Sequence, residues 1–458
     1  MKKAKSIICI LLMATMLVGT VSGCSSKQTS EGDSKDTKGG KTLRFLDVNP
    51  SPERQAYFEG VFEDFEKETG NKVEYESVPW DDAANKVTVL GSANELPDVL
   101  VTTEAWMPQL TEAGWLTPLD DYVDEHEDEY VALCTNVNWR YQRESYGSAY
   151  TVPDGFNVKG IFYRKDWVEE IGYEIPTGDD WTYDAYFDLI AALTDKEKNR
   201  YGNSFRGGRG GFDPILVYMQ TFFDGYCYDE EGNSIVNTPE GIEAFKKWCD
   251  VYKNGYAAED SVNWGFVEMV DNFTGGLTGT LLNDSEVSAS CFANMEDDQW
   301  GVLPMPVSED GTRINSCGFG YGYSVPSQGD NQEEAIELID FLSRSENNIE
   351  YCKMGGFIPV KKDVADDPLY GPDGPYAAFV EQVNDPDTIV ATGIGFFNST
   401  DLQQDMLFTE LQKYLMGSKS AEDVCNTIGN ELTKRMKQYL EENPGTTVEQ
   451  PKKVGESE

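Results

Sequence analysis

The sequence predicts an α/β protein made of two lobes, each a mainly parallel β-sheet flanked by helices. Two observations lead to this prediction. Early in the chain, short apolar runs alternate with segments of helical periodicity, which is the pattern of βαβ units. The body that follows the first 40 residues is about 400 residues long, more than one hydrophobic core normally organises.

The first 40 residues have the features of an export signal followed by a tether. Lys2, Lys3 and Lys5 precede a short apolar stretch, and small residues then lead to Cys24. This stretch is shorter than the roughly 20 apolar residues of a membrane span, so we interpret residues 1–23 as a secretory signal. Up to residue 40 the chain is rich in Gly, Ser and Thr, which predicts a flexible tether after Cys24.

The first strand of the body is expected over residues 41–48, where apolar side chains dominate. Ser51 can cap the helix that follows, with Pro52 at its first position. Apolar residues then recur at helical spacing until Gly70, which is expected to end the helix. A cap is therefore the structural role expected of Ser51.

The alternation continues after this helix. A second strand is expected around residues 73–75, a helix over 81–91 and a third strand over 97–101. At the other end of the chain, residues 446–458 are polar and include proline and glycine. We expect them to form a disordered tail.

The chain is strongly acidic, with a formal net charge of −44. A field of this sign repels nucleic acids and anionic lipid surfaces, so a nucleic-acid partner is excluded. Anionic ligands are disfavoured for the same reason. Neutral and cationic ligands remain.

Nine cysteines are present, of which Cys9 lies in the leader. With Cys24 set aside, an odd number remains, and no close-spaced pair suggests a disulfide framework. We favour buried free thiols over a disulfide network. The cysteines concerned are Cys134, Cys227, Cys249, Cys291, Cys317, Cys352 and Cys425.

The single histidine, His126, lies in an acidic run and has no second imidazole with which to form a zinc site. A solvated helix face explains it better than a metal site. Serine or cysteine catalysis of the triad type would have to use His126, and no G-x-S-x-G elbow accompanies it.

A series of short motifs, in order, resembles the extracellular solute-binding proteins of ABC importers, the family that includes maltose-binding protein. The resemblance covers about residues 41–440. Its landmarks are ETGNKV at 68–73, LPDV at 96–99, GWLTPLDDY at 114–122, YTVP at 150–153, FYRKD at 162–166, WTYD at 181–184, LPMP at 303–306, the glycine-rich 318–322 and GFIPV at 356–360.

This resemblance implies a two-lobed fold that holds its ligand in the cleft between the lobes. Lobe one would comprise residues 41–150 plus 318–350, and lobe two residues 151–317 plus 351–445. The crossings between lobes would fall near residues 150–153, 317–323 and 350. In open α/β sheets, ligands bind at the carboxyl ends of strands, which points to the same segments.

The resemblance also implies a function. A neutral sugar or oligosaccharide would be captured and delivered to ABC permease subunits, without catalysis and with neither cofactor nor metal. The residues before Cys24 resemble a lipobox, which implies a lipid on Cys24 that tethers a monomeric protein to the extracellular face of the cell membrane. The lipid would be the only membrane contact.

A sugar presents a ring face that an aromatic side chain can cover and a rim of hydroxyls that needs polar partners. We therefore look for aromatic residues beside acids or amides on loops that follow strands. In lobe one these are Asn49, Trp80, Glu104 and Trp106. Packing under the next helix is an alternative role for Trp106.

Lobe two and the return crossing supply the remaining candidates. Arg206 and Phe212 lie in a glycine-rich loop that begins a helix, and Tyr321 lies between glycines that allow close approach of a ligand. The other candidates in these segments are Phe156, Asn157, Trp264, Asn283, Asp284 and Phe319, most of them at positions that the family often uses. Phe396 and Phe397 are a further aromatic pair.

Two alternatives remain open. The same fold could bind a cationic peptide or a polyamine through the acids of the cleft. A glycoside hydrolase could use paired carboxylates such as Glu104 and Asp284 for acid–base chemistry.

Overall fold

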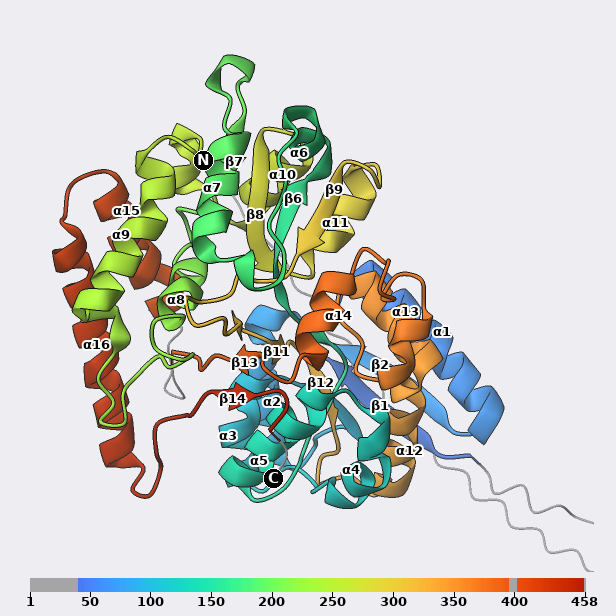
Figure 1. Cartoon of the computed structure of the whole chain (residues 1–458). Helices are drawn as coiled ribbons and strands as arrows, with labels where there is room; N and C mark the ends of the chain where they lie inside the picture. Colours follow the sequence, from blue (N-terminus) through green and yellow to red (C-terminus); the bar gives the residue numbers. More distant parts are fainter. Residues whose placement is uncertain (1–39, 395–401, 457–458) are drawn as a thin grey trace, which may run out of the picture. The chain divides into compact units, whose positions relative to one another are not determined.

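The computed structural model describes residues 40–394 and 402–456, which form an α/β fold with two main sheets (Figure 1). The predicted secretory signal, Cys24 and most of the tether lie outside the described residues, as do Phe396 and Phe397. In the described part of the chain, every helix is too short or too polar to cross a membrane.

The first lobe is built on a five-stranded sheet in the order β2-β1-β3-β12-β4. β1 is parallel to β2 and β3, whereas β12 is antiparallel to β3 and β4. The strands are β1 (Thr42–Asp47), β2 (Lys72–Ser77), β3 (Val99–Thr102), β4 (Val152–Pro153) and β12 (Gly322–Ser324).

Helices from two distant parts of the sequence accompany this sheet. Those of the first part are α1 (Pro52–Thr69), α2 (Trp80–Ala93), η1 (Glu104–Trp106), α3 (Met107–Glu112), α4 (Asp120–His126), η2 (Glu127–Glu129), η3 (Leu133–Trp139) and α5 (Arg140–Tyr146). Those of the second part are α12 (Gln332–Ser343), α13 (Ser345–Gly355) and η8 (Lys362–Asp366).

Local sequence rules explain the beginning and the end of α1. The Ser51 hydroxyl accepts a hydrogen bond from the backbone N–H of Arg54, and Pro52 occupies the first turn. Gly70 ends the helix with a φ of 81°, a left-handed conformation that favours glycine. The cap predicted at Ser51 and the stop predicted at Gly70 are both confirmed.

The second lobe has a four-stranded sheet in the order β7-β8-β6-β9. β6 is antiparallel to both of its neighbours, and only β7 and β8 run parallel. Both main sheets are thus mixed rather than mainly parallel, because β6 and β12 run against strands that belong to other parts of the chain. The strands are β6 (Lys159–Arg164), β7 (Tyr201–Asn203), β8 (Thr278–Asp284) and β9 (Trp300–Leu303).

Helices of the second lobe come from its middle and from the C-terminal part of the chain, where α9 and α16 pack side by side (Figure 1). The earlier ones are α6 (Lys165–Ile171), η4 (Gly178–Asp180), α7 (Tyr183–Leu193), η5 (Lys196–Lys198), α8 (Asp213–Gln220), η6 (Ile235–Asn237) and α9 (Pro239–Lys253). The later ones are η7 (Glu259–Asn263), α10 (Phe266–Thr274), α11 (Val287–Asn294), α14 (Ala377–Asn384), η9 (Leu402–Met406), α15 (Leu407–Leu415) and α16 (Ala421–Glu442).

A two-stranded ribbon joins the lobes. β5 (Phe156–Asn157) pairs with β11 (Gly318–Phe319), close to the first two crossings expected from the sequence. The third passage lies later than residue 350. Ile358 exchanges backbone hydrogen bonds of 2.8 and 2.9 Å with Phe156, and the Val131 N–H donates to the Val360 carbonyl of the same segment at 2.9 Å.

The C-terminal segment is ordered, which corrects the expectation of a disordered tail. β14 (Lys452–Lys453) pairs with β13 (Ile389–Val390), which in turn pairs with β10 (Ile314–Asn315). Val454 is completely buried. A polar, proline-containing segment is held here by strand pairing and by two buried valines, Val448 and Val454, which its composition does not reveal.

Two hydrophobic cores organise the chain. One surrounds the first sheet, includes Phe58 and Phe62 of α1, and continues to Phe162 and Trp300 on the second sheet. The other surrounds α7, α8, α9 and α16. The first core is therefore shared between the lobes.

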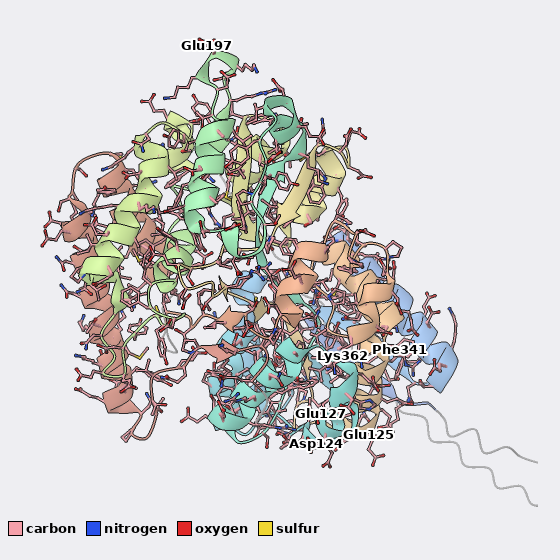
Figure 2. All side chains as sticks on the ribbon, viewed as in Figure 1. Asp124, Glu125, Glu127, Glu197, Phe341 and Lys362 are labelled. Carbon is pink, nitrogen blue, oxygen red and sulfur yellow. The ribbon has the colours of Figure 1, made fainter. Side chains whose placement is uncertain are left out.

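Acidic side chains gather on the surface around α4. Figure 2 shows Asp124, Glu125 and Glu127 pointing outward, and all three are exposed. His126 is paired only with Glu129, at 3.2 Å, among the described residues. The run is thus a solvated helix face, as the sequence indicated.

The seven cysteines of the described residues are free thiols, as favoured from the sequence. Six are buried and Cys317 is half-buried. They act as small apolar side chains of the interior.

Arg54 is the centre of a buried charged cluster in the first lobe. The residue is 3% exposed, and its Nε lies 2.9 Å from Oδ1 of Asp47. Its Nη2 lies 3.8 Å from Oδ2 of Asp154, to which the Tyr351 hydroxyl donates at 2.6 Å. The Tyr351 hydroxyl also contacts the guanidinium. One cation thus joins β1, α1, the first crossing and α13.

We predict that Arg54→Leu lowers the free energy of unfolding by about 3–5 kcal/mol, because it leaves the buried Asp47 carboxylate without its cation. Denaturation by urea measures the loss. Lys67→Met, in the same helix, removes an exposed ion pair with Asp64 and is the matched control, for which no measurable change is expected. Equal stability of the two variants would contradict the role assigned to Arg54.

Candidate ligand-binding site

Lys159, at the start of β6, is the centre of a second charged cluster, in lobe two. Its side chain is 5% exposed, and its Nζ lies 2.9 Å from Asp213 Oδ2 and 2.9 Å from Asp284 Oδ1. Burial alone would lower the pKa of Lys159, but the two carboxylates raise it above its ordinary value. Lys159 and Asp284 face each other in the register of β6 and β8, which explains their proximity.

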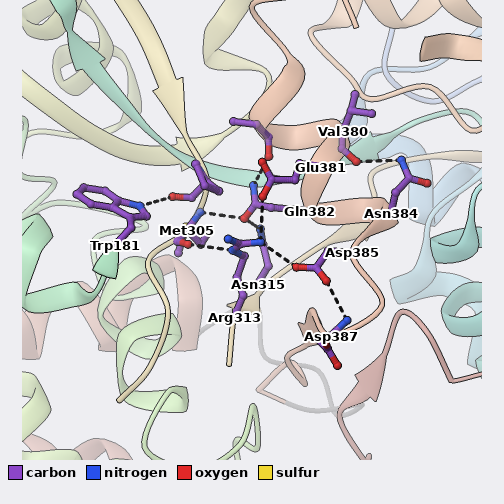
Figure 3. A network of polar contacts seen from close by, with 12 residues as sticks. Trp181, Met305, Arg313, Asn315, Val380, Glu381, Gln382, Asn384, Asp385 and Asp387 are labelled. Atoms are coloured by element: carbon purple, nitrogen blue, oxygen red, sulfur yellow. Dashed lines mark hydrogen bonds and ion pairs between the residues drawn. The ribbon is translucent and has the colours of Figure 1, made fainter. Parts of the chain in front are cut away.

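A network of buried amides holds the backbone of Lys159 in place, and Figure 3 shows two of its members, Asn315 and Gln382, together with Arg313. The Asn315 side chain accepts from the Lys159 N–H at 3.2 Å and donates to its carbonyl at 3.0 Å. Gln382 of α14 accepts from Asn315 at 2.8 Å and also donates to the Lys159 carbonyl, at 3.1 Å. Arg313 continues the network to Asp385 at 3.0 Å. The cation of the cluster thus has a rigid support.

Arg206 lies beside this cluster with part of its guanidinium unpaired. The residue is half-buried, its Nε is buried without a hydrogen-bond partner among the described residues, and its guanidinium lies 5.7 Å from the Phe266 ring centroid. Burial lowers the pKa of Arg206, against the pull of Asp213, Asp284 and Glu286. A buried donor without an acceptor is costly, so this N–H is available to a ligand.

A small cavity adjoins Arg206. Its lining includes Asp213, Met269 and Asn283, and its volume is about 20 Å³, room for one or two water molecules. The cavity is too small for a sugar ring. It can accept a single polar group of a larger ligand.

Tyr321 connects this region to the first lobe. Its ring centroid lies 5.4 Å from the Arg54 guanidinium, and burial raises the pKa of its hydroxyl to about 12, with Arg54 opposing and Glu286 adding to the rise. The residue is half-buried. Asn157, on the ribbon, has a buried Oδ1 without a partner among the described residues. Both side chains lie where the lobes meet.

Glu104 opens η1 in the first lobe and is solvent-exposed. The surrounding protein nevertheless raises the pKa of its carboxyl to about 7, and no described residue forms a hydrogen bond or ion pair with that carboxyl. Trp106, two positions on, is half-buried against the core.

Several candidates from the sequence lie in the cores. The exposed fractions are 1% for Phe156, 2% for Phe212, 5% for Trp264, 5% for Phe319 and 8% for Asn283. Phe156 and Phe319 are paired across the ribbon and both face the first core, whereas Phe212 packs against Phe245 in the second. Position after a strand does not tell which side chain points outward, so the burial of these residues could not be predicted from it.

The other candidates are accessible or lie outside what is described. Asn49 is half-buried, and its N–H donates to Asp47 Oδ1 at 3.1 Å. Asp284 is half-buried and bound to Lys159. Trp80 is the first residue of α2, and its side chain lies outside the described part.

Four residues of the region were missed from the sequence: Lys159, Asp213, Phe266 and Glu286. Glu286 keeps an exposed surface, but the protein around it displaces part of its hydration. This desolvation raises the pKa of its carboxyl, and the nearby Asp284 charge adds to the rise. Phe266 opens α10 two residues after Trp264, and its ring is half-exposed. The spacing of Phe266, Met269 and Phe273 is helical, and it could have predicted that a helix begins near Phe266.

The arrangement is suited to binding. The partly buried rings of Phe266 and Tyr321 accompany Arg206 Nε and Asn157 Oδ1, which have no hydrogen-bond partner among the described residues. Rings beside polar groups are the pattern that a hydroxyl-rich ligand needs. Among the described residues, no group of three or more His, Cys, Asp or Glu side chains is placed to hold a metal ion.

Comparison with known proteins gives matches of three kinds, to a family model, to related sequences and to solved structures, and all of them are solute-binding or sugar-binding proteins. The family model "Bacterial extracellular solute-binding protein" matches residues 49–349. The galactooligosaccharide-binding protein of Bacillus subtilis is 23% identical over 80% of this chain and 83% of its own. The erythritol/L-threitol-binding protein of Mycolicibacterium smegmatis is 23% identical over 71% and 72%. The structure of the sugar-binding protein MalE from Xanthomonas citri matches with a TM-score of 0.72 and 19% identity, covering 88% of this chain and 100% of that one. The structural match establishes the two-lobed fold.

We predict that Trp264→Ala and Phe266→Ala have different effects. Trp264 is 5% exposed, so its truncation should lower the free energy of unfolding by about 3–5 kcal/mol. The Phe266 ring is half-exposed, so Phe266→Ala should cost clearly less stability while removing the ring beneath Arg206. Urea denaturation compares the two. Equal losses would assign both rings to the core.

Proposed function

The chain belongs to the bacterial extracellular solute-binding proteins, and from that premise we propose that it captures a neutral sugar, oligosaccharide or polyol and delivers it to an ABC permease. The relatives named above are binding proteins, which supports a function without catalysis. The proposal takes the protein to act as a monomer. It is held at the extracellular face of the membrane by a lipid on Cys24.

The unpaired Nε of Arg206 above the Phe266 ring is the observation that supports a hydroxyl-rich ligand most directly. Lys159 is already neutralised by Asp213 and Asp284, so the cluster needs no anionic ligand. The carboxylate oxygens of this cluster have further lone pairs, which hydroxyl groups can use as acceptors.

A cationic ligand is the second candidate. Glu104 has no cationic partner among the described residues, and none of them forms an ion pair with Glu286. A polyamine would supply the missing positive charge. Titration calorimetry against sugars, oligosaccharides, polyols and polyamines separates the two proposals, and binding of amines alone would remove the first.

We predict that Arg206→Gln weakens binding of the neutral ligand about 10- to 100-fold, the loss expected for a charge-assisted hydrogen bond. The melting temperature should stay the same or rise, because the substitution removes a desolvated cation that forms no ion pair with any described residue. Arg209→Gln is the matched control, since Arg209 is exposed in the same loop. A loss of affinity shared by both variants would show a general effect of loop charge and contradict the role given to Arg206.

We also predict that Cys24→Ala releases the exported protein from the membrane. The lipid is expected to supply the anchor, because the predicted tether is polar. Incorporation of a labelled fatty acid into the unmodified protein, but not into the variant, provides the measurement. Absence of label from the unmodified protein, or equal labelling of the variant, would rule out the lipid on Cys24.

A further inference from the structure

Residues 448–455, which include β14, contact both lobes, and we call this segment the strap. Its backbone is paired on the side of lobe two, where β14 lies antiparallel to β13 (Figure 1). The pairing continues past β14, since the N–H groups of Val454 and Gly455 donate to the carbonyls of Thr388 and Pro386, both at 3.0 Å. The strap therefore extends the small sheet to which β13 belongs.

The strand that holds the strap is itself fixed to lobe two. α14, which precedes β13, packs against β6 and β9 of the second sheet. After β13, the Thr392 N–H donates to the Gly225 carbonyl at 3.0 Å, and the Thr392 hydroxyl accepts from the Cys227 N–H at 3.0 Å. Cys227 is buried in the second core. Both ends of β13 are thus attached to lobe two.

Side chains of the strap add to this attachment. Val448 is 5% exposed and lies in the second core. The Tyr226 hydroxyl donates to the Gln450 side chain at 2.8 Å. Pro451 lies against Gly225, where an added Cβ would be 3.2 Å from the Pro451 Cβ. Lobe two therefore holds the strap at several points along its length.

The attachment to lobe one consists of side-chain contacts. Asn136 of η3 donates to the Val454 carbonyl at 2.6 Å. Lys452 forms an ion pair with Glu144 of α5, whose side chain is 46% exposed and is shared with Arg140 at 2.9 Å. Val454 is completely buried in the first core, which the lobes share, so its burial strengthens the contact between them.

The two attachments differ in strength. A single neutral hydrogen bond makes a modest net contribution to stability, and a partly exposed ion pair contributes little and is weakened by salt. Leaving lobe two would instead separate a pair of strands and bring the buried Val448 side chain into water. The attachment to lobe one is therefore the weaker of the two.

We propose that the strap restrains the two lobes against separation, remaining on lobe two while its contacts with Asn136 and Glu144 of lobe one form and break. The strap reaches lobe one apart from the passages near residues 150–157, 317–323 and 358–360, so it adds a non-covalent connection to the covalent ones. This inference concerns the contact between the lobes and does not depend on which ligand is bound.

The test uses Asn136→Asp combined with Lys452→Gln. The first substitution puts a carboxylate, which accepts hydrogen bonds but cannot donate them, against the Val454 carbonyl. The second removes the cation of the ion pair with Glu144. Deleting the strap would uncover two buried valines and could unfold the protein, so point substitutions are preferred.

The matched control is Asn347→Asp combined with Lys41→Gln. Asn347 donates to the Phe341 carbonyl at 2.7 Å, and Lys41 forms an ion pair with Glu334 at 2.7 Å. Both contacts lie within lobe one. The control thus loses the same two kinds of contact without loosening the connection between the lobes.

Small-angle X-ray scattering of the proteins without ligand measures the separation of the lobes. Asn136→Asp with Lys452→Gln should have a larger radius of gyration than the unmodified protein, and the control should not. Equal radii in the two double variants would overturn the restraint. Lys452→Gln alone, for which a smaller increase is expected, replaces the double variant if the latter loses its near-ultraviolet circular dichroism.

Amide hydrogen exchange decides which lobe keeps the strap. The acceptors of the Val454 and Gly455 N–H groups lie beside β13. Exchange at both amides in Asn136→Asp with Lys452→Gln should therefore stay within about tenfold of the unmodified protein. Exchange as fast as in an unfolded chain, in this variant or in the unmodified protein, would overturn the attachment of the strap to lobe two.

Discussion

A single buried cation, Arg54, is the constraint on which the arrangement of the first lobe depends. An unpaired charge in the interior is costly, so the surrounding chain must bring it acceptors. Asp47 comes from β1, Asp154 from the first crossing, and the Tyr351 hydroxyl from α13. The guanidinium also lies over three rings, at 5.0 to 5.4 Å from their centroids. Four separate segments thus have their relative positions set by one side chain.

In lobe two, the buried cation Lys159 is likewise surrounded by carboxylates, those of Asp213 and Asp284. A short stretch of backbone connects this cluster to the Arg54 cluster. Asp154 and Lys159 lie at either end of the same short crossing, so each lobe fastens one end of it through buried charge. Asn157 and its partner strand lie between these two anchors. The backbone there is held on both sides, and the Asn157 Oδ1 in between has no hydrogen-bond partner among the described residues.

The features that could be predicted from the sequence are those that depend on residues close together in the chain. The cap at Ser51, the stop at Gly70 and the first three strands were predicted to within a few residues, because capping and apolar periodicity depend on neighbours in sequence. Strand direction in the mixed sheets, the late third passage and the pairing of β14 with β13 depend on partners distant in the sequence. In the candidate site, the sequence pointed to Glu104 after a strand and to Tyr321 between glycines. Phe266 was passed over in favour of Trp264, because the burial of side chains two positions apart can differ and the sequence does not show which is buried.

The discontinuity of the first lobe affects how the chain can fold. Arg54 and Tyr351, which meet in the native cluster, are separated by 297 positions in the sequence. Bringing such distant segments together has an entropic cost that grows with the length of the intervening chain, and non-local contacts of this kind slow folding. A growing chain that has reached only the third strand cannot yet complete its own first lobe. Its aromatic side chains around α1 then remain uncovered, and such transient intermediates are the species on which holding chaperones act.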